Sequence, residues 1–249
     1  MDIICDTNIW YGIGAGYIKY KKAEDLKLWG THLSIDELSK SEKLLSPSLR
    51  DFLRKAIQAM IKNKNVIYEH PFFRLLVESK KDYKYDIKEK DGKLLEFTQL
   101  IANHHDIDEE SNRAKFKDYV TDRKARIQVG TDFFSGLISN YKNSLKKPSS
   151  SNKENNPVVI REFIKLIVKS VTKEDLPDDF DWSRIELFEK ALDYYFSKLE
   201  NSEMKIKNND WLDLAFLVYV RPGQKIWTKD KRLKALIKES GLAEYLFEK

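Results

Sequence analysis

The sequence predicts an α/β fold of three α/β/α layers, in which a short, mostly parallel sheet is flanked by helices and carries a large helical insertion. Apolar strand patterns near both ends of the chain alternate with helical patterns, an order typical of parallel sheets covered by helices. The 249 residues include only 9 glycines and 6 prolines, too few turn residues for a sandwich of many short strands. With 41% hydrophobic residues the chain can bury a substantial core.

The N-terminal part is predicted to contribute strands and helices in alternation. Residues 2–5 form an apolar stretch that is typical of a short buried strand, and a helix follows it. A second short strand is expected at 32–35, followed by helices at 36–44 and 47–62. Pro47 suits the first position of a helix, and Ser46 before it suits an N-cap.

The C-terminal part repeats this alternation. Asn208 and Asn209 can cap a helix that reaches residue 219, and the Arg-Pro-Gly sequence at 221–223 ends it. A strand at 225–228 and a helix at 230–240 follow, with Gly241 as the stop signal. We therefore expect one domain spanning 1–249, with a core built from about 1–76 and 206–249.

The middle of the chain, 77–205, is predicted to be a helical insertion. Apolar residues recur there at helical spacing and almost no strand pattern interrupts them. Residues 146–157 contain no apolar side chain larger than proline, so they cannot help to bury a core and are expected to form a mobile loop. The loop divides the insertion and does not mark a domain boundary, because the sheet needs both ends of the chain.

Composition restricts the location and chemistry of the chain. The longest apolar run, 214–220, is far shorter than the roughly 20 residues that cross a bilayer. Acidic residues near the N-terminus replace the basic ones of an export signal, so a cytoplasmic location without membrane contact is expected. The single cysteine, Cys5, excludes an internal disulfide framework. The net charge of +5 is mild and gives only a hint of an anionic partner.

Five carboxylates stand where this fold would gather them. Asp6 follows the first strand and Asp230 follows the last one, and ligand sites of parallel sheets lie beyond the carboxyl ends of the strands. Glu37 opens the helix that we expect after the second strand. Asp210 and Asp213 lie three positions apart on a helix that is otherwise apolar. These five acids are the candidate catalytic residues.

Each acid also has a structural explanation. Asp6, Asp210 and Asp230 could each serve only as a helix cap, and Glu37 could respond only to a helix dipole. The pair Asp210 and Asp213 is harder to explain in this way, because two like charges on an apolar helix are costly unless a cation neutralises them. An all-oxygen ligand set favours Mg²⁺ or Mn²⁺ over zinc.

The ordered set of acids and their neighbours resembles the four sparse motifs of PIN-domain nucleases. The matching segments, in chain order, are Asp6-Thr7-Asn8, Glu37, Asn209-Asp210 before Leu214-Ala215, and Thr228-Lys229-Asp230. The resemblance covers about residues 1–45 and 205–247. The middle region is much longer than in the small toxin nucleases of toxin–antitoxin pairs.

The resemblance implies a PIN-like fold and a metal-dependent endoribonuclease that cleaves single-stranded or structured RNA. It implies that one or two Mg²⁺ or Mn²⁺ ions are bound, with the metal ligands Asp6, Asp210 and Asp230 and with Glu37 in the same site. Asp213 matches an extra acid found only in some members, which leaves open which aspartate of the pair is the inner ligand. Asn8 is expected to orient Asp6, and Thr228 is expected to steady the site.

The expected partners follow from the same features. RNA is the expected substrate, and the basic residues beside the last acid, Lys229, Lys231 and Arg232, are candidates for nucleic-acid contact. A PIN-like module that binds RNA or protein without cleavage, and a DNA or flap-type nuclease, remain alternatives. A protein partner such as an antitoxin, and a homodimer, also remain open.

Overall fold

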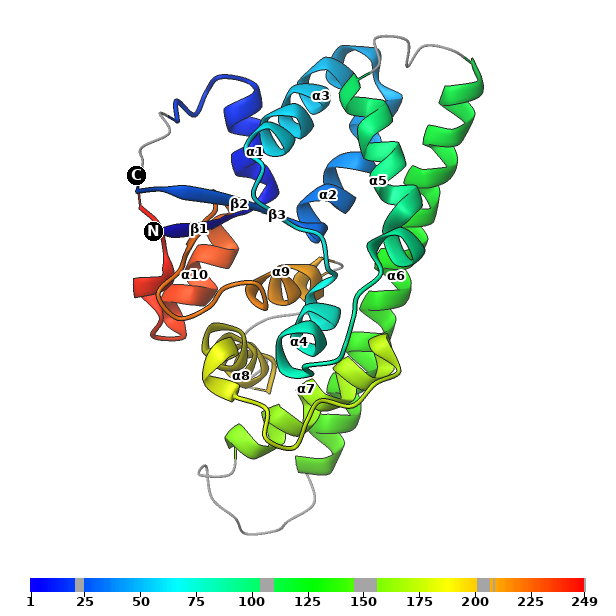
Figure 1. The fold of residues 1–249 in the computed structure, drawn as a ribbon. Helices are drawn as coiled ribbons and strands as arrows, with labels where there is room; N and C mark the ends of the chain where they lie inside the picture. The colour runs from blue at the N-terminus through cyan, green and yellow to red at the C-terminus, as the bar shows by residue number, and fades with distance from the viewer. Residues whose placement is uncertain (21–24, 104–109, 146–155, 201–206, 208, 249) are drawn as a thin grey trace.

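The computed structural model describes residues 1–249 except 21–24, 104–109, 146–155, 201–206, 208 and 249. Its sheet has four parallel strands in the order β3-β2-β1-β4, namely β1 (Asp2–Cys5), β2 (Lys27–Thr31), β3 (Val66–Ile67) and β4 (Lys225–Trp227). The α-helices of the described residues are α1 (Thr7–Gly14), α2 (His32–Ser39), α3 (Pro47–Lys62), α4 (Pro71–Ser79), α5 (Ile87–Asn103), α6 (Glu110–Leu145), α7 (Asn156–Thr172), α8 (Glu186–Glu200), α9 (Asp210–Leu217) and α10 (Lys231–Glu239). The molecule is therefore an α/β protein with an all-parallel sheet, as predicted (Figure 1).

Helices cover both faces of the sheet. Successive side chains of a strand point to opposite faces, and the β1 residues separate in this way into two hydrophobic cores. Ile3 and Cys5 pack with residues of α1, α3 and α5, whereas Ile4 packs with residues of α4 and of α7 to α10. Figure 1 shows α1 and α3 on one side of the strands and α8 to α10 on the other. These are the three layers that the sequence indicates.

The two ends of the chain meet in the sheet, as expected. Ile3, Ile4 and Cys5 of β1 pair in parallel with β4. The predicted helix at 47–62 is confirmed as α3. The last helix is also confirmed: Asp230 caps α10, and Gly241 follows it with φ of +80°, a left-handed conformation that glycine adopts at little cost.

The second strand lies earlier in the chain than predicted. Residues 27–31 form β2, and the predicted strand at 32–35 is the first half of helix α2. Thr31 causes the switch, because its side chain accepts a hydrogen bond from the Ser34 backbone N–H at 3.2 Å and so caps α2. Glu37 consequently lies in the second turn of α2 and does not open a helix. The short strand β3 was not predicted.

The described residues between β3 and β4 are helical or irregular, and none of them joins the sheet. Of the loop predicted at 146–157, residues 146–155 lie outside the described part of the chain, and Asn156 and Pro157 begin α7. Helix α6 has 36 residues, which corresponds to a length of roughly 54 Å. It contributes Phe116 to the core on one side of the sheet and Phe134 and Ile138 to the core on the other. The carboxyl ends of the strands point toward α6 (Figure 1).

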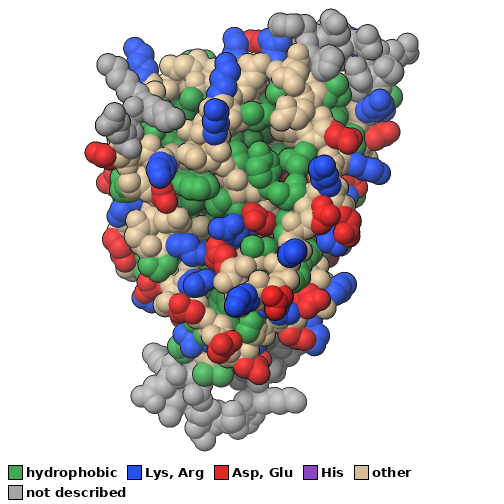
Figure 2. All heavy atoms as spheres, in the orientation of Figure 1, with side chains coloured by type: hydrophobic (Ala, Val, Ile, Leu, Met, Phe, Trp, Pro, Cys, Tyr) green, Lys and Arg blue, Asp and Glu red, His purple; other side chains and the backbone are tan. Residues whose placement is uncertain are grey.

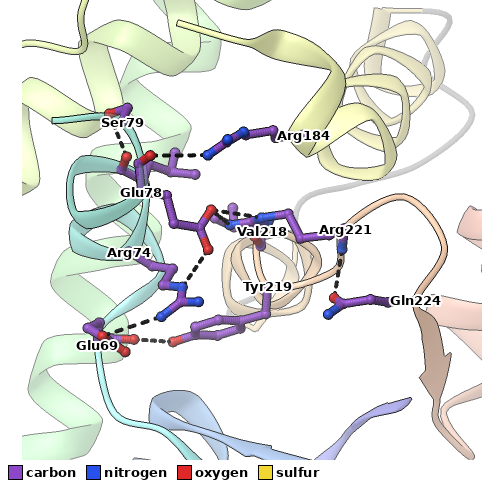
Figure 3. Close-up of polar contacts among 10 residues, drawn as sticks. Glu69, Arg74, Glu78, Ser79, Arg184, Val218, Tyr219, Arg221 and Gln224 are labelled. Carbon is purple, nitrogen blue, oxygen red and sulfur yellow. Dashed lines mark hydrogen bonds and ion pairs between the residues drawn. The ribbon is translucent and has the colours of Figure 1, made fainter. Parts of the chain in front are cut away.

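A partly buried ion network ties the sheet-forming ends to the middle of the chain (Figure 3). Glu78 at the end of α4 accepts hydrogen bonds from Arg74 at 2.6 Å and from Arg221 Nε at 2.9 Å. Arg184 donates to the Glu78 backbone carbonyl at 3.1 Å. Arg221 follows α9, so this network fixes the helix that carries Asp210 and Asp213 against α4.

The surface carries charges of both signs. On the face shown in Figure 2, basic and acidic side chains are interspersed over the lower half and do not separate into two fields. Among the described helices, none is long and apolar enough to cross a membrane.

Candidate functional site

Asp6 lies at the carboxyl end of β1 and is held by residues from both ends of the chain. It is the N-cap of α1, and its Oδ1 accepts from the Thr7 backbone N–H at 2.6 Å. Its Oδ2 accepts from Thr228 Oγ1 at 2.6 Å and from the side-chain amide of Asn8. Thr228 and Asn8 are thus the neighbours of Asp6 that the sequence indicates, and both contact it directly.

Glu37 reaches the same region from α2. It is exposed, and its Oε2 accepts a hydrogen bond from Thr7 Oγ1 at 2.9 Å. Thr7 therefore links two candidate acids, because its backbone N–H binds Asp6 while its hydroxyl binds Glu37. The resemblance to PIN-domain motifs does not assign a role to Thr7.

Asp210 is bound on both of its carboxylate oxygens. Its side chain is buried, and Oδ2 accepts from Tyr195 Oη at 2.8 Å and from the Lys207 backbone N–H at 2.8 Å. Oδ1 is paired with Arg232 at 2.9 Å. It is the first residue of α9, and Asn209 stands at the cap position. Asp210 therefore fixes the start of α9 to α8 and α10.

Asp213 has the opposite environment. It is half-buried one turn further along α9, and no described residue donates a hydrogen bond to its carboxylate or forms an ion pair with it. Asp213 lines two adjacent cavities, one with Asp6 and Glu37 and one with Asp210 and Arg232. Of the two aspartates on α9, Asp213 is the one whose oxygens are free for a ligand.

Asp230 follows β4 and caps α10. Its Oδ1 accepts from the backbone N–H groups of Arg232 at 2.7 Å and Leu233 at 3.0 Å. The Asp230 backbone N–H in turn donates to Thr228 Oγ1 at 3.0 Å. Thr228 therefore connects Asp230 to Asp6, so that the acids after the first and last strands share one hydrogen-bonded residue.

The carboxylates lie close enough to change one another's ionisation. Burial raises the pKa of Asp6 to about 6, and the charges of Glu37 and Asp230 add to this effect, while hydrogen bonds from Thr228 and Thr7 oppose it. The pKa of Asp213 rises to about 8, because burial and the negative charges of the other four acids all disfavour its ionised form. All five predicted acids thus contribute to one negative region.

The pKa of Asp36, beside this region, is lowered and not raised. Burial opposes its ionisation, but Lys40 at 2.8 Å and Arg123 at 3.2 Å outweigh burial and lower the pKa of its carboxyl. The chain thus neutralises Asp36 with Lys40 and Arg123 and Asp210 with Arg232, whereas Asp213 has no counter-ion among the described residues. This difference is the unusual electrostatic feature of the region, since an unneutralised acid in a cleft is a candidate for function.

The acidic cavity between α1, α2, α6 and α9 is small. Its volume of about 40 Å³ is enough for an ion or a few waters, since one water needs roughly 10–15 Å³ by this measure. Arg123 of α6 forms part of its wall together with Leu212 and Phe216. Motif spacing could not identify Arg123 or Asp36, because α6 reaches the sheet only through the tertiary fold.

The side chains of the site suit a hard divalent cation by their chemistry, but not by their present arrangement. Carboxylate and hydroxyl oxygens are the ligands that Mg²⁺ and Mn²⁺ prefer, and the excess negative charge around Asp213 would be relieved by such an ion. In the described part of the chain, however, no three Asp, Glu, His or Cys side chains are arranged so that they could hold a metal. Asp6, Asp213, Glu37 and Asp230 fit the ion by chemistry, and binding requires new side-chain conformers.

The three predicted nucleic-acid contacts lie beside this site. Lys229 and Lys231 are exposed, and the Lys229 backbone N–H donates to Asn8 Oδ1 at 2.9 Å. Arg232 is half exposed and is paired with Asp210, so only part of its guanidinium faces solvent.

Comparisons of the chain with protein-family models, with curated proteins and with solved structures gave no match.

Proposed function

We propose that this protein is a Mg²⁺- or Mn²⁺-dependent endoribonuclease with a PIN-like site. The observation that carries the proposal is geometric: Asp213, without a hydrogen-bond or ion-pair partner among the described residues, lines one small cavity with Asp6 and Glu37. The raised pKa of Asp213, caused by burial and by the four other carboxylates, agrees with this crowding of negative charge. A protein gains no stability from such an arrangement, since like charges in a partly buried cleft oppose folding. A divalent cation would relieve the repulsion and would keep the carboxylates ionised at neutral pH.

In this proposal each residue has a defined part. Asp6 and Asp213 supply ligand oxygens, and Thr228 and Asn8 hold the Asp6 carboxylate in place through their hydrogen bonds. Glu37 lines the same cavity, and Asp230 adds negative charge beside it. A metal ion bound there would polarise a phosphodiester group and lower the pKa of a bound water. Asp210 has a supporting part, because it is buried and Arg232 already balances its charge.

The position of the cavity agrees with this use. It lies at the carboxyl end of β1 and beside α2, the helix that follows β2, at the edge where parallel α/β sheets bind their ligands. Lys229 and Lys231 stand exposed beside it and can contact the phosphates that flank a scissile bond. RNA is proposed over DNA on the strength of the resemblance to PIN-domain nucleases, and a DNA or flap-type substrate is the outcome to test against it.

A second candidate is an RNA- or protein-binding module of the same fold that does not cleave. The observation that favours it is that four of the five acids have a structural partner: Asp6 and Asp230 cap helices, Glu37 accepts from Thr7, and Asp210 is ion-paired. An enzyme and a binder differ in their response to metal. Chelation stops the first and leaves the second unchanged.

Cleavage of labelled single-stranded and hairpin RNA tests the proposal. Asp6→Asn and Asp213→Asn should each lower Mn²⁺-dependent cleavage by at least about 100-fold, since each removes a charge that the ion requires. Asparagine is also a good N-cap, so Asp6→Asn should keep α1 intact. The matched control is Asp178→Asn at an exposed site, which should cleave as the wild type does.

Single-stranded and branched DNA are cleaved in parallel to decide the substrate. Cleavage that survives both substitutions, or that is indifferent to chelator, would contradict the assignment of these acids. RNA binding without any cleavage would select the binding module.

A further inference from the structure

A second and larger cavity lies on the other side of α9. Its volume is about 460 Å³, and it is enclosed by α4, α6, α7, α8 and α9. Its lining is largely apolar and includes the aromatic side chains of Phe72, Phe133, Phe134, Phe188 and Trp211. Phe133 is 41% exposed and Val129 at the rim is 68% exposed, so the chain leaves large apolar surface uncovered at this place. Nothing in the proposed cleavage chemistry uses this cavity.

The two cavities share walls. On α9, Leu212 and Asp213 line the acidic cavity, while Trp211 and Leu214 line the aromatic one. On α6, Arg123 lines the acidic cavity, and Arg126, one turn further on, lines the aromatic one. Three residues correspond to roughly 4.5 Å along a helix. A single strand advances roughly 3.4 Å or more per nucleotide, so a strand held at the acids reaches the aromatic cavity within a few nucleotides.

The lining favours a flat, partly polar ligand over a purely aliphatic one. Trp211 Nε1 and His70 Nδ1 belong to lining residues, and both atoms are buried without a hydrogen-bond partner among the described residues. Burial lowers the pKa of His70 to about 3, so its ring is neutral and suits an uncharged partner. A nucleobase offers both a π face for the phenylalanines and edge groups for such nitrogens.

Helix α6 approaches Trp211 closely enough to fix the indole in the wall. A Cβ atom at Gly130 would lie 2.5 Å from Trp211 Cζ2, so only glycine allows this separation. Arg126 stands at the rim with its side chain 71% exposed and pairs with Asp122 at 2.9 Å. A guanidinium at that position can exchange a surface carboxylate for a phosphate of a bound strand.

We propose that this aromatic cavity binds one unpaired nucleobase of a nucleic acid whose backbone lies across the mouth of the acidic cavity. The inference rests on the proposed function, because it assumes a nucleic-acid strand at the acids. Extrusion of a base into the cavity would fix the register of the strand and would favour unpaired over paired substrate, since a paired base must first be unstacked. The insertion would thereby select the substrate, because α6 and α7 supply much of the cavity wall.

The test measures binding in place of cleavage. Fluorescence anisotropy with the Asp6→Asn protein in saturating Mn²⁺, which keeps the cation at the acids while cleavage is lowered, gives the Kd for a single-stranded RNA and for a series in which one nucleotide at a time is abasic. One abasic position, a few nucleotides from the cut site, should weaken binding by about 10-fold, as the loss of one base–aromatic stack does. The other positions should change Kd by less than about 2-fold.

A matched pair of variants identifies the cavity as the cause. Phe133→Ala removes a wall of the cavity, while Leu166→Ala removes a side chain of similar exposure, 46%, on α7 outside the lining. In Phe133→Ala the sensitive abasic position should lose its effect, whereas Leu166→Ala should keep the wild-type profile. Circular dichroism checks that both variants are folded.

The outcomes separate the two proposals. If the wild type cleaves RNA but every abasic position is equivalent, or if both variants share one profile, the nucleobase site is wrong and the nuclease stands. An apolar protein segment as the true occupant predicts this same flat profile. If the wild type neither binds nor cleaves RNA, both proposals are wrong.

Discussion

At the scale of residues, the difference between Asp210 and Asp213 decides how the site is understood. The two lie on one helix turn, yet Asp210 is buried with donors on both oxygens, while Asp213 has no partner among the described residues and a pKa raised to about 8. Sequence alone could not separate them, because Tyr195 and Arg232 reach Asp210 only through the tertiary fold. We therefore propose Asp213, and not Asp210, as the metal ligand of this pair.

Replacing each aspartate by asparagine should change the stability of the metal-free protein in opposite directions. At pH 8, Asp213→Asn should raise the free energy of unfolding by at least about 1 kcal/mol, since it removes a charge whose folded pKa lies far above its unfolded value. Asp210→Asn should lower it by about 1–3 kcal/mol, because Arg232 would lose its ion-pair partner. Urea denaturation in chelator measures both.

The pH dependence follows from the same pKa values. Between about pH 4 and pH 8 the folded protein holds protons on Asp6 and Asp213 that the unfolded chain has released, so the contribution of these groups to stability falls as pH rises through this range. The gain from Asp213→Asn should therefore shrink toward zero near pH 4. Equal effects of this substitution at pH 4 and pH 8 would contradict the raised pKa.

At the scale of elements, the sequence predicted those helices and strands whose signals lie within the element itself. The strand at 2–5, the helix at 47–62 and the helix after Asp230 were all predicted and are confirmed as β1, α3 and α10. The second strand was misplaced because the alternation of polar and apolar residues at 32–35 fits a strand, and only the pairing of 27–29 with β1 and the Thr31 cap show that these residues begin a helix. Strand β3 has 2 residues, too few to carry a period.

The ion network around Glu78 should be essential to the stability of this arrangement of helices. Glu78→Gln would leave Arg221, whose side chain is only 16% exposed, without its counter-charge. The free energy of unfolding should fall by about 2–4 kcal/mol in urea denaturation, as expected when one partner of a buried ion pair is removed. The control is Glu162→Gln, whose exposed pairing with Lys165 should be worth less than about 1 kcal/mol. Equal losses of unfolding free energy in both variants would contradict a stabilising role for this network beyond that of an exposed ion pair.

At the scale of the whole molecule, residues far apart in the sequence form one site because the two ends of the chain lie side by side in the sheet. Asp6 and Thr228 are 222 positions apart and share a hydrogen bond of 2.6 Å. The insertion completes the site, since α6 carries Arg123 into the acidic cavity and Arg126 into the aromatic one. The convergence of the acids could be foreseen from strand ends, whereas the part played by α6 could not, because no motif marks it.

The central claim is that these acids converge in order to hold a divalent cation, and a direct Mn²⁺ binding titration tests it most simply. Electron paramagnetic resonance of free Mn²⁺ at pH 7.5 should show saturable binding by the wild type, with the Kd raised at least about 10-fold in both Asp6→Asn and Asp213→Asn, and unchanged in Asp178→Asn. Asp210→Asn should weaken binding less than Asp213→Asn does. A wild type that binds no Mn²⁺ at millimolar concentration, or Asp6→Asn and Asp213→Asn variants that bind it as the wild type does, would contradict the account.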